Sequence, residues 1–292
     1  MMNFVLKLVS LLPLSWVHRI GSVSGRIAYR FGERFRRLMH DNLAQAGLEG
    51  KVDINEINRH AGMQALEPFW IWKRSDADVM RHVRWDDAEC DAVREALAAG
   101  CSIVFMTPHV GCYEVTPIWL YDTCLKLFDK KMTVLYREPK VKFIRAAVAN
   151  GRIREGMDPA PADLAGVRKI LRAMRSGGTL GCLPDQVPGR GEGVWVPFFG
   201  RKAFTMTFPV KMAKQFDAVR FVAWAVRDPG HGWTCHVRRW DDELTGDLEQ
   251  DTIAMNRVIE ETILQSPEQY IWNYNRFKCP KGVAKPDQET AA

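Results

Sequence analysis

The sequence lacks the cysteine and histidine spacings of a disulfide scaffold or a metal site. Its seven cysteines are odd in number, and no two of them form a CxxC pair. No H-x-x-x-H spacing occurs among its seven histidines, so we expect neither a bound metal nor another cofactor. An odd number of cysteines without CxxC pairs is typical of a protein in a reducing compartment, where most thiols are small core residues.

Long apolar runs are also missing. Residues 3–17 are apolar, but Lys7 and Pro13 interrupt them, and no charge-free stretch there reaches the roughly 20 residues of a spanning helix. The small residues 21–25 are compatible with a cleaved signal peptide, whereas the cysteine usage argues against export. No internal repeat is visible.

Basic residues are concentrated at the N-terminus. The first 40 residues contain seven Lys or Arg and one Glu, which accounts for the whole net charge of +6. Such asymmetry indicates an anionic surface as partner, either lipid or nucleic acid. We expect three parts: a membrane-associating segment over residues 1–40, a main domain over 41–283 and a flexible tail over 284–292.

The basic segment has the periodicity of an amphipathic helix. Its apolar residues recur at steps of three and four: Ile20, Val23, Ile27, Phe31, Phe35 and Leu38. Its basic residues follow helical spacing on another face: Arg19, Arg26, Arg30, Arg34 and Arg37. This pattern favours a helix in a membrane interface; a helix packed on the core with a solvated basic face is the alternative. Nucleic-acid binding is disfavoured because no recognition module is visible.

The rest of the chain alternates strands and helices. We expect strands at 102–106, 132–136, 179–183, 219–226 and 232–238. We expect helices at 53–74, 86–99, 112–128, 142–149, 164–176 and 252–265. This order predicts an α/β fold with a mostly parallel central sheet flanked by helices. Glycines at 189–193 form a loop rather than a dinucleotide fingerprint, because no helix follows them.

Polar residues follow three of the predicted strands. His109 comes after residues 102–106, Arg137 after 132–136 and Asp185 after 179–183. Carboxyl ends of parallel strands meet at one sheet edge, where α/β proteins keep their ligand crevices. Histidine is a natural general base near neutral pH. These residues therefore outline a site.

Several motifs carry a family resemblance. His109 followed by Glu114 resembles the HX4D/E signature of the lysophospholipid-type acyltransferase superfamily. Further matching segments follow in order: 151–154 (GRIR), 183–186 (LPDQ), 194–200 (VWVPFFG) and 267–278 (PEQYIWNYNRFK). Together they resemble the late acyltransferases of lipid A biosynthesis, the lauroyl/myristoyl transferase family, from about residue 15 to 283.

The resemblance implies a bacterial enzyme at the cytoplasmic face of the inner membrane. Such an enzyme moves a fatty acyl chain from acyl-acyl carrier protein to a hydroxyl of a lipid A precursor, beside anionic membrane lipids and without nucleic acid. The N-terminal helix is shorter and more interrupted here than in many members. A glutamate at position 114, rather than the aspartate usual in the glycerolipid branch, favours the lipid A branch.

The chemistry expected of the loop follows from its residue types. His109 takes the proton of the acceptor hydroxyl, and Glu114 orients the imidazole and stabilises the imidazolium. Backbone N–H groups of Gly111 and Cys112, near a helix start, are candidate oxyanion donors. The Cys112 thiol is a weaker candidate as covalent nucleophile, because direct transfer from a thioester needs no enzyme thiol.

Further residues are candidates for holding the substrate. Arg152 or Arg154 suits the oxyanion or a phosphate, and the resemblance favours Arg152. Asp185 positions that arginine or the substrate, with Arg137 and Gln186 nearby. Alternatives are a glycerolipid or other amphiphilic acceptor, a metal-free lipid hydrolase, and a scaffold in which His109 and Glu114 are a structural pair.

Overall fold

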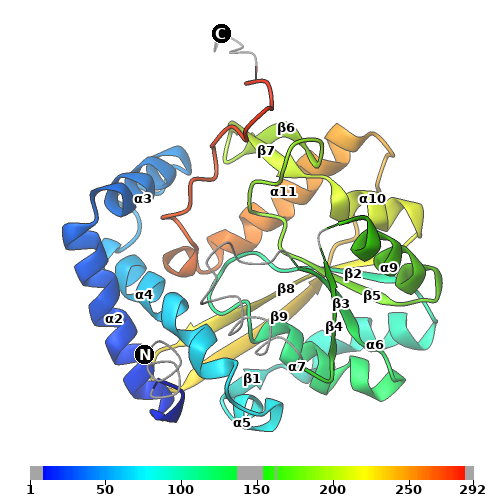
Figure 1. Cartoon of the computed structure of the whole chain (residues 1–292), viewed down its shortest axis with the longest axis horizontal. Coiled ribbons are helices and arrows are strands. Elements are labelled where there is room, and N and C mark those ends of the chain that lie inside the picture. The colour runs from blue at the N-terminus through cyan, green and yellow to red at the C-terminus, as the bar shows by residue number, and fades with distance from the viewer. Residues whose placement is uncertain (1–8, 137–153, 162, 287–292) are drawn as a thin grey trace.

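The computed structural model describes residues 9–136, 154–161 and 163–286 (Figure 1). Its centre is a seven-stranded sheet in the order β1-β9-β8-β2-β5-β3-β4. The strands are β1 (Val83–Trp85), β2 (Ile103–Met106), β3 (Met132–Tyr136), β4 (Met157–Pro161), β5 (Thr179–Cys182), β8 (Val219–Asp228) and β9 (Gly232–Arg239). All neighbouring strands are parallel except β8 and β9. The expected α/β class with a mostly parallel sheet is confirmed.

Helices cover both faces of this sheet. They are α2 (Leu14–Phe31), α3 (Glu33–Gln45), α4 (Ile54–Ile71), α5 (Asp76–Met80), α6 (Asp91–Ala98), α7 (Thr116–Thr123), α9 (Leu164–Arg175), α10 (Phe208–Gln215) and α11 (Leu248–Leu264). Short 3-10 turns are η1 (Asp87–Cys90), η2 (Leu125–Phe128) and η3 (Pro267–Gln269). One hydrophobic cluster joins α2, α6 and α7 to the sheet, and another joins α9, α10 and α11 to its opposite face.

Strand β2 lies in the middle of the sheet and fixes the position of the site. Its side chains alternate between the two clusters, with Phe105 in one and Met106 in the other. Met106 is in register with Cys182 at the end of β5 and with Val222 of β8. The segments that follow β2 and β5 therefore leave the sheet side by side.

Two expected helices differ from the structure. The amphipathic helix expected as one element is two helices, α2 and α3, separated at Gly32. The helix expected over 112–128 begins only at Thr116, because residues 110 and 111 form β-bridges with Tyr270 and Ala225. Glu114 therefore precedes the helix instead of lying in its first turn. The helix expected at 142–149 lies outside the described residues.

Other elements were not predicted. The region 193–206, expected as a loop and a following apolar segment, forms the antiparallel hairpin of β6 (Gly193–Phe198) and β7 (Arg201–Met206). Strand β4 contains Pro159 and Pro161, which lack the N–H that a central strand needs. These prolines are tolerated because β4 is the edge strand of the sheet.

Helix α2 lies at the outside of the molecule and packs along α4 (Figure 1). Small residues allow this close approach. A Cβ at Gly25 would lie 1.8 Å from the backbone oxygen of Asn58, and a Cβ at Gly62 would lie 2.0 Å from that of Gly21. No helix within the described ranges is both long and apolar enough to cross a membrane.

We expect Gly25→Val to separate α2 from α4, because its side chain has no space against the Asn58 carbonyl. Overpacking of this kind costs about 1–3 kcal/mol or more in the free energy of unfolding. Urea unfolding followed by circular dichroism measures the loss. Val23→Ile, on the exposed side of the same helix, is the matched control and should change stability by less than about 0.5 kcal/mol. Equal effects of the two substitutions would contradict this packing.

Candidate active site

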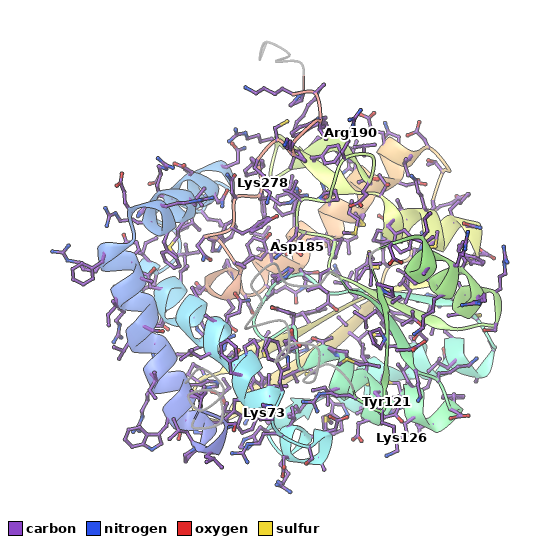
Figure 2. All side chains as sticks on the ribbon, in the orientation of Figure 1. Lys73, Tyr121, Lys126, Asp185, Arg190 and Lys278 are labelled. Carbon is purple, nitrogen blue, oxygen red and sulfur yellow. The ribbon has the colours of Figure 1, made fainter. Side chains whose placement is uncertain are left out.

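His109 and Asp185 meet at the carboxyl ends of β2 and β5. The His109 ring donates from Nδ1 to Oδ1 of Asp185 at 2.8 Å, and the His109 backbone N–H donates to Oδ2 at 2.8 Å. Both residues are almost fully buried, with 6% and 2% of their surface exposed. The carboxylate therefore fixes both the ring and the backbone of the histidine. Figure 2 shows Asp185 in the interior, close to the middle of the molecule.

The second ring nitrogen of His109 faces Gln186. The Gln186 side-chain N–H donates to Nε2 of His109 at 3.1 Å. With Nδ1 donating to a carboxylate, Nε2 carries the lone pair and accepts this bond. The Tyr113 ring packs on the imidazole with a centroid distance of 4.6 Å. The neighbours thus favour the tautomer in which Nε2 is the basic atom.

Asp185 stays ionised in this setting. Burial alone would raise the pKa of its carboxyl, but the His109 ring and the two hydrogen bonds from His109 outweigh burial and lower that pKa. The buried guanidinium of Arg276 contributes in the same direction. Arg276 donates to the Phe204 carbonyl and the Thr205 hydroxyl and lies over the Phe198 ring.

Glu114 is not the carboxylate on Nδ1 of His109. That position belongs to Asp185, whereas Glu114 accepts a 3.0 Å hydrogen bond from the Trp72 indole N–H at the end of α4. The expectation that Glu114 orients the imidazole is corrected accordingly. The reason is the parallel pairing of β2 and β5, which brings a residue 76 positions away closer to Nδ1 than one in the same loop.

The expectation that the Gly111 and Cys112 N–H groups bind the oxyanion is also corrected, because both donate within the protein. The Gly111 N–H donates to the Gln269 carbonyl at 3.0 Å, and the Cys112 N–H donates to the Ala225 carbonyl at 2.9 Å. Gly111 is required because its φ is +57° and a Cβ would lie 1.9 Å from the Ala225 oxygen. The Cys112 thiol is buried, and burial raises its pKa well above the ordinary value, which disfavours a thiolate nucleophile.

The arginines expected at the site fall into two groups. Arg154 forms an ion pair with Asp76 and donates to the backbone carbonyls of Ile71 and Arg74. It holds the end of α4, which corrects the expectation that it contacts substrate. Arg137 and Arg152 lie outside the described residues.

A buried polar network supports the His109 loop from behind, and sequence reasoning missed it. Arg227 forms an ion pair with Glu67 of α4, through Nε at 2.5 Å and Nη2 at 2.6 Å. Arg227 also donates to the Gly111 carbonyl at 3.0 Å, and Gln64 donates to the carbonyls of His109 and Gly111 at 3.1 Å each. These bonds satisfy the carbonyl groups of the loop and fix its path.

The same network reaches α2 through histidines. His18 of α2 bonds to Glu67 at 2.9 Å, and the Trp233 indole N–H donates to the same carboxylate at 3.0 Å. Nδ1 of His60 accepts from Arg227 at 3.0 Å. Burial, followed by the charge of Arg227, lowers the pKa of His60 to about 3, so its ring is neutral. A charged Glu67 among apolar residues was the sequence signal for a buried partner.

The fold and the site define an α/β protein with a buried histidine–aspartate pair at the ends of two parallel strands. Such a pair is suited to removing a proton from a hydroxyl group. The sequence model of the family described as "Bacterial lipid A biosynthesis acyltransferase" matches residues 1–279. The chain therefore belongs to this family.

Individual relatives are similar at low identity. The chain is 25% identical over 294 residues to a "Lipid A biosynthesis lauroyltransferase" of Escherichia coli (strain K12), covering 96% of this chain and 91% of the relative. It is 24% identical over 275 residues to a "Lipid A biosynthesis palmitoleoyltransferase" of the same strain, covering 91% and 86%. A "Lipid A biosynthesis acyltransferase" of Haemophilus influenzae is 29% identical over 186 residues, covering 62% and 55%.

His60 generates a prediction about stability and pH. Its pKa in the folded protein, about 3, lies below the 6.5 of an ordinary histidine, so the unfolded chain binds the proton first. Stability should therefore fall as pH decreases through 6.5, by up to about 1.4 kcal/mol per pH unit from this residue. Between pH 6.5 and 5, His60→Gln should flatten the slope of unfolding free energy against pH, measured by urea titration. An unchanged slope would contradict a buried, neutral His60.

Proposed function

We propose that this protein transfers a fatty acyl chain from acyl-acyl carrier protein to a hydroxyl of a lipid A precursor. The observation that carries the proposal is the His109–Asp185 pair, which leaves Nε2 of the imidazole as a base. Family membership supports acyl transfer in lipid A biosynthesis, and the relatives' names include lauroyl and palmitoleoyl transfer.

The reaction needs one proton to move twice. Nε2 of His109 removes the proton from the acceptor hydroxyl as its oxygen attacks the thioester carbonyl carbon. The C–S bond then breaks, and the proton passes from Nε2 to the departing thiolate, which leaves as a thiol. Asp185 stabilises the imidazolium between these steps, as the acid of a Ser-His-Asp triad does. Gln186 occupies Nε2 in the structure, so its amide must move aside for the hydroxyl.

Glu114 and Arg152 act beside this pair in the proposed site. Glu114 is 6% exposed and its bond to Trp72 ties the His109 loop to α4, which makes it a positioning residue. A cation is needed for the developing oxyanion or a substrate phosphate, because the N–H groups of Gly111 and Cys112 are used inside the protein. Arg152, with Arg137 nearby in the chain, supplies it in this proposal.

Helix α2 supports the proposal that the enzyme works at the cytoplasmic face of the inner membrane. Its buried face carries Leu14 and Val17 together with small or polar residues. A second apolar stripe faces outward: Trp16, Ile20, Val23, Ile27 and Phe31. The Phe31 side chain is 78% exposed. Arg19 and Arg30 lie over the Trp16 and Phe31 rings, so basic groups border the stripe. An apolar face with basic flanks suits the surface of an anionic bilayer.

The assay that tests the function uses detergent-purified protein, labelled acyl-acyl carrier protein and a tetra-acyl lipid A precursor. We expect labelled penta-acyl product, with His109→Ala and Asp185→Asn reducing turnover by about 10²–10⁴-fold. Glu114→Ala should reduce turnover more than Glu114→Gln, which can still accept from Trp72. Cys112→Ala is the control and should keep near wild-type turnover, because its thiol takes no part.

Two outcomes would contradict this function. Release of free fatty acid without labelled lipid A would indicate a hydrolase. Near wild-type turnover in Asp185→Asn, with the variant folded by circular dichroism, would exclude the proposed role of the carboxylate.

The membrane proposal predicts a loss of vesicle binding when the stripe is charged. Ile27→Glu combined with Phe31→Glu should reduce binding to phosphatidylglycerol-containing vesicles by at least about tenfold in flotation, because two apolar side chains no longer enter the bilayer. Leu164→Glu, which also places a carboxylate at an exposed apolar position but on α9, should bind as the wild type does. Equal flotation of the stripe variant and the wild type would exclude this face.

A further inference from the structure

A basic groove lies between α3 and the C-terminal segment. It has a volume of about 360 Å³ and is open to solvent. Arg34, Phe35 and Leu38 form the α3 side, and residues 273–275 with Lys278 form the other. Figure 2 shows Lys278 on the segment that runs past α3. The volume of the groove falls in the range of small-ligand sites, roughly 300–1,000 Å³.

The groove presents two cations and no acidic lining residue. Arg34 offers a planar guanidinium, the group that grips phosphate bidentately, and Lys278 adds an ammonium. The Lys278 ammonium lies 5.0 Å from the centre of the Tyr274 ring, which keeps it at the groove wall. Within the described residues neither cation is in an ion pair with a carboxylate. An anion is therefore the complementary ligand.

The remaining lining residues suit a sugar. Asn273 and Asn275 bring side-chain amides, each with donors and an acceptor for hydroxyl groups. Tyr274, which lies between them in the sequence, adds an aromatic lining residue. Phe35 and Leu38 add apolar surface, and they follow in sequence the exposed stripe of α2, which ends at Phe31. A ligand with a phosphorylated sugar and an acyl part matches this arrangement, with the sugar against the amides and cations and the acyl part against the apolar residues.

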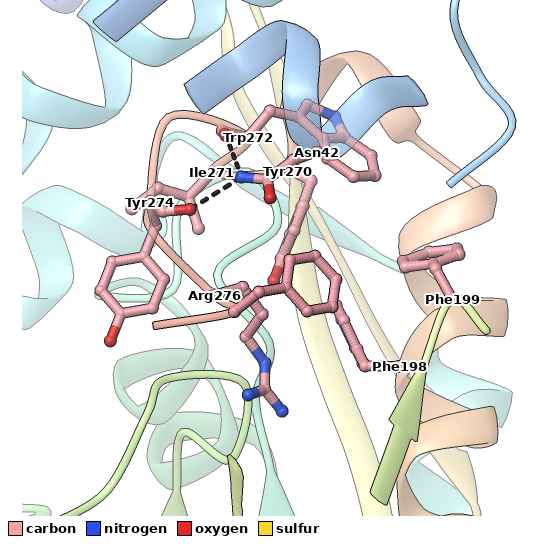
Figure 3. A pocket seen from close by; sticks show the side chains of 9 residues that line it. Asn42, Phe198, Phe199, Tyr270, Ile271, Trp272, Tyr274 and Arg276 are labelled. Carbon is pink, nitrogen blue, oxygen red and sulfur yellow. Dashed lines mark hydrogen bonds between the residues drawn. The ribbon is translucent and has the colours of Figure 1, made fainter. Parts of the chain in front are cut away.

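The groove wall is rigidly joined to the catalytic loop. The Asn42 side chain donates to the Trp272 carbonyl at 2.6 Å and to the Tyr274 carbonyl at 2.8 Å, which fixes the turn (Figure 3). The Tyr274 hydroxyl accepts from the Val187 N–H at 3.0 Å. Val187 follows Gln186, the residue bonded to Nε2 of His109. One hydrogen-bonded path thus links the groove to the basic nitrogen.

We propose that this groove binds the phosphorylated sugar of the acyl acceptor, with Arg34 and Lys278 on the phosphate. The proposal rests on the function proposed above and adds a phosphate subsite that sets acceptor affinity. A concave site with two amides and a phenol fits a phosphosugar better than a carrier-protein helix, which needs a broader surface. It also fits better than a lone lipid phosphate, which would leave the amides without hydroxyl partners.

The kinetic test compares the double variant Arg34→Ala/Lys278→Ala with Lys51→Ala, which removes an exposed cation from the loop after α3 outside the groove. With a phosphorylated glucosamine-disaccharide lipid acceptor, the double variant should raise the acceptor KM about tenfold. Its kcat and its KM for acyl-acyl carrier protein should stay within about twofold. With the dephosphorylated acceptor, wild type and double variant should have equal KM values.

A binding test separates this subsite from the enzymatic function. Glucosamine 1-phosphate is titrated into the full-length protein in detergent and followed by ³¹P NMR, with inorganic phosphate in a parallel titration and glucosamine added as a competitor of bound glucosamine 1-phosphate. Saturable binding of glucosamine 1-phosphate that is lost in the double variant and kept in Lys51→Ala supports the groove even where no acyl transfer is measured. Tighter binding of inorganic phosphate than of glucosamine 1-phosphate would overturn the sugar assignment.

Three kinetic or membrane outcomes would overturn the proposal. A raised KM for acyl-acyl carrier protein with an unchanged acceptor KM would make the groove a carrier-protein surface. An equal loss with the dephosphorylated acceptor would exclude phosphate recognition. Reduced flotation on phosphatidylglycerol vesicles together with unchanged NMR binding would assign Arg34 and Lys278 to the membrane surface instead.

Discussion

The hydrogen bond from Nδ1 of His109 to Asp185 is the interaction on which the rest of the site depends. It joins the ends of two neighbouring parallel strands, so it forms only when β2 and β5 are paired in register. Both partners are buried, and a buried carboxylate is costly unless hydrogen bonds and opposite charge compensate it. His109 supplies both hydrogen bonds through its ring and its backbone, and Arg276 supplies a buried positive charge nearby.

The position of His109 also requires a fixed loop, and the loop is held mainly through its carbonyl groups. Arg227 and Gln64 donate to them, and Glu67 neutralises Arg227 in the interior. Because Glu67 also bonds to His18 of α2, the helix with the exposed apolar stripe is built on the same polar core as the catalytic loop. The surface that we assign to the membrane and the site therefore belong to one packed unit.

The sequence predicted the sheet and both residues of the central pair, but not the hydrogen bond between them. The apolar runs at 102–106 and 179–183 located β2 and β5, and the expectation that His109 and Asp185 share a sheet edge is confirmed. The carboxylate that orients the imidazole was expected to be Glu114, but Asp185 bonds to the ring instead, because proximity in sequence carries no information on strand register. The hydrogen bonds of the Gly111 and Cys112 N–H groups could not be predicted either, since their acceptors, the carbonyls of Gln269 and Ala225, come from distant segments. Strand β4 was not predicted because it contains Pro159 and Pro161. Prolines are compatible with a strand at this place only because β4 is the edge of the sheet.

Asp185 holds the His109 imidazole with Nε2 as its basic nitrogen, and this arrangement can be measured. Nitrogen-15 NMR of protein with labelled histidine, assigned by comparison with His109→Ala, reads the tautomer directly. We predict that the neutral ring of His109 carries its proton on Nδ1, and that Asp185→Asn shifts the population toward the Nε2-protonated form. A wild-type ring protonated at Nε2, or a tautomer unaffected by Asp185→Asn, would contradict it.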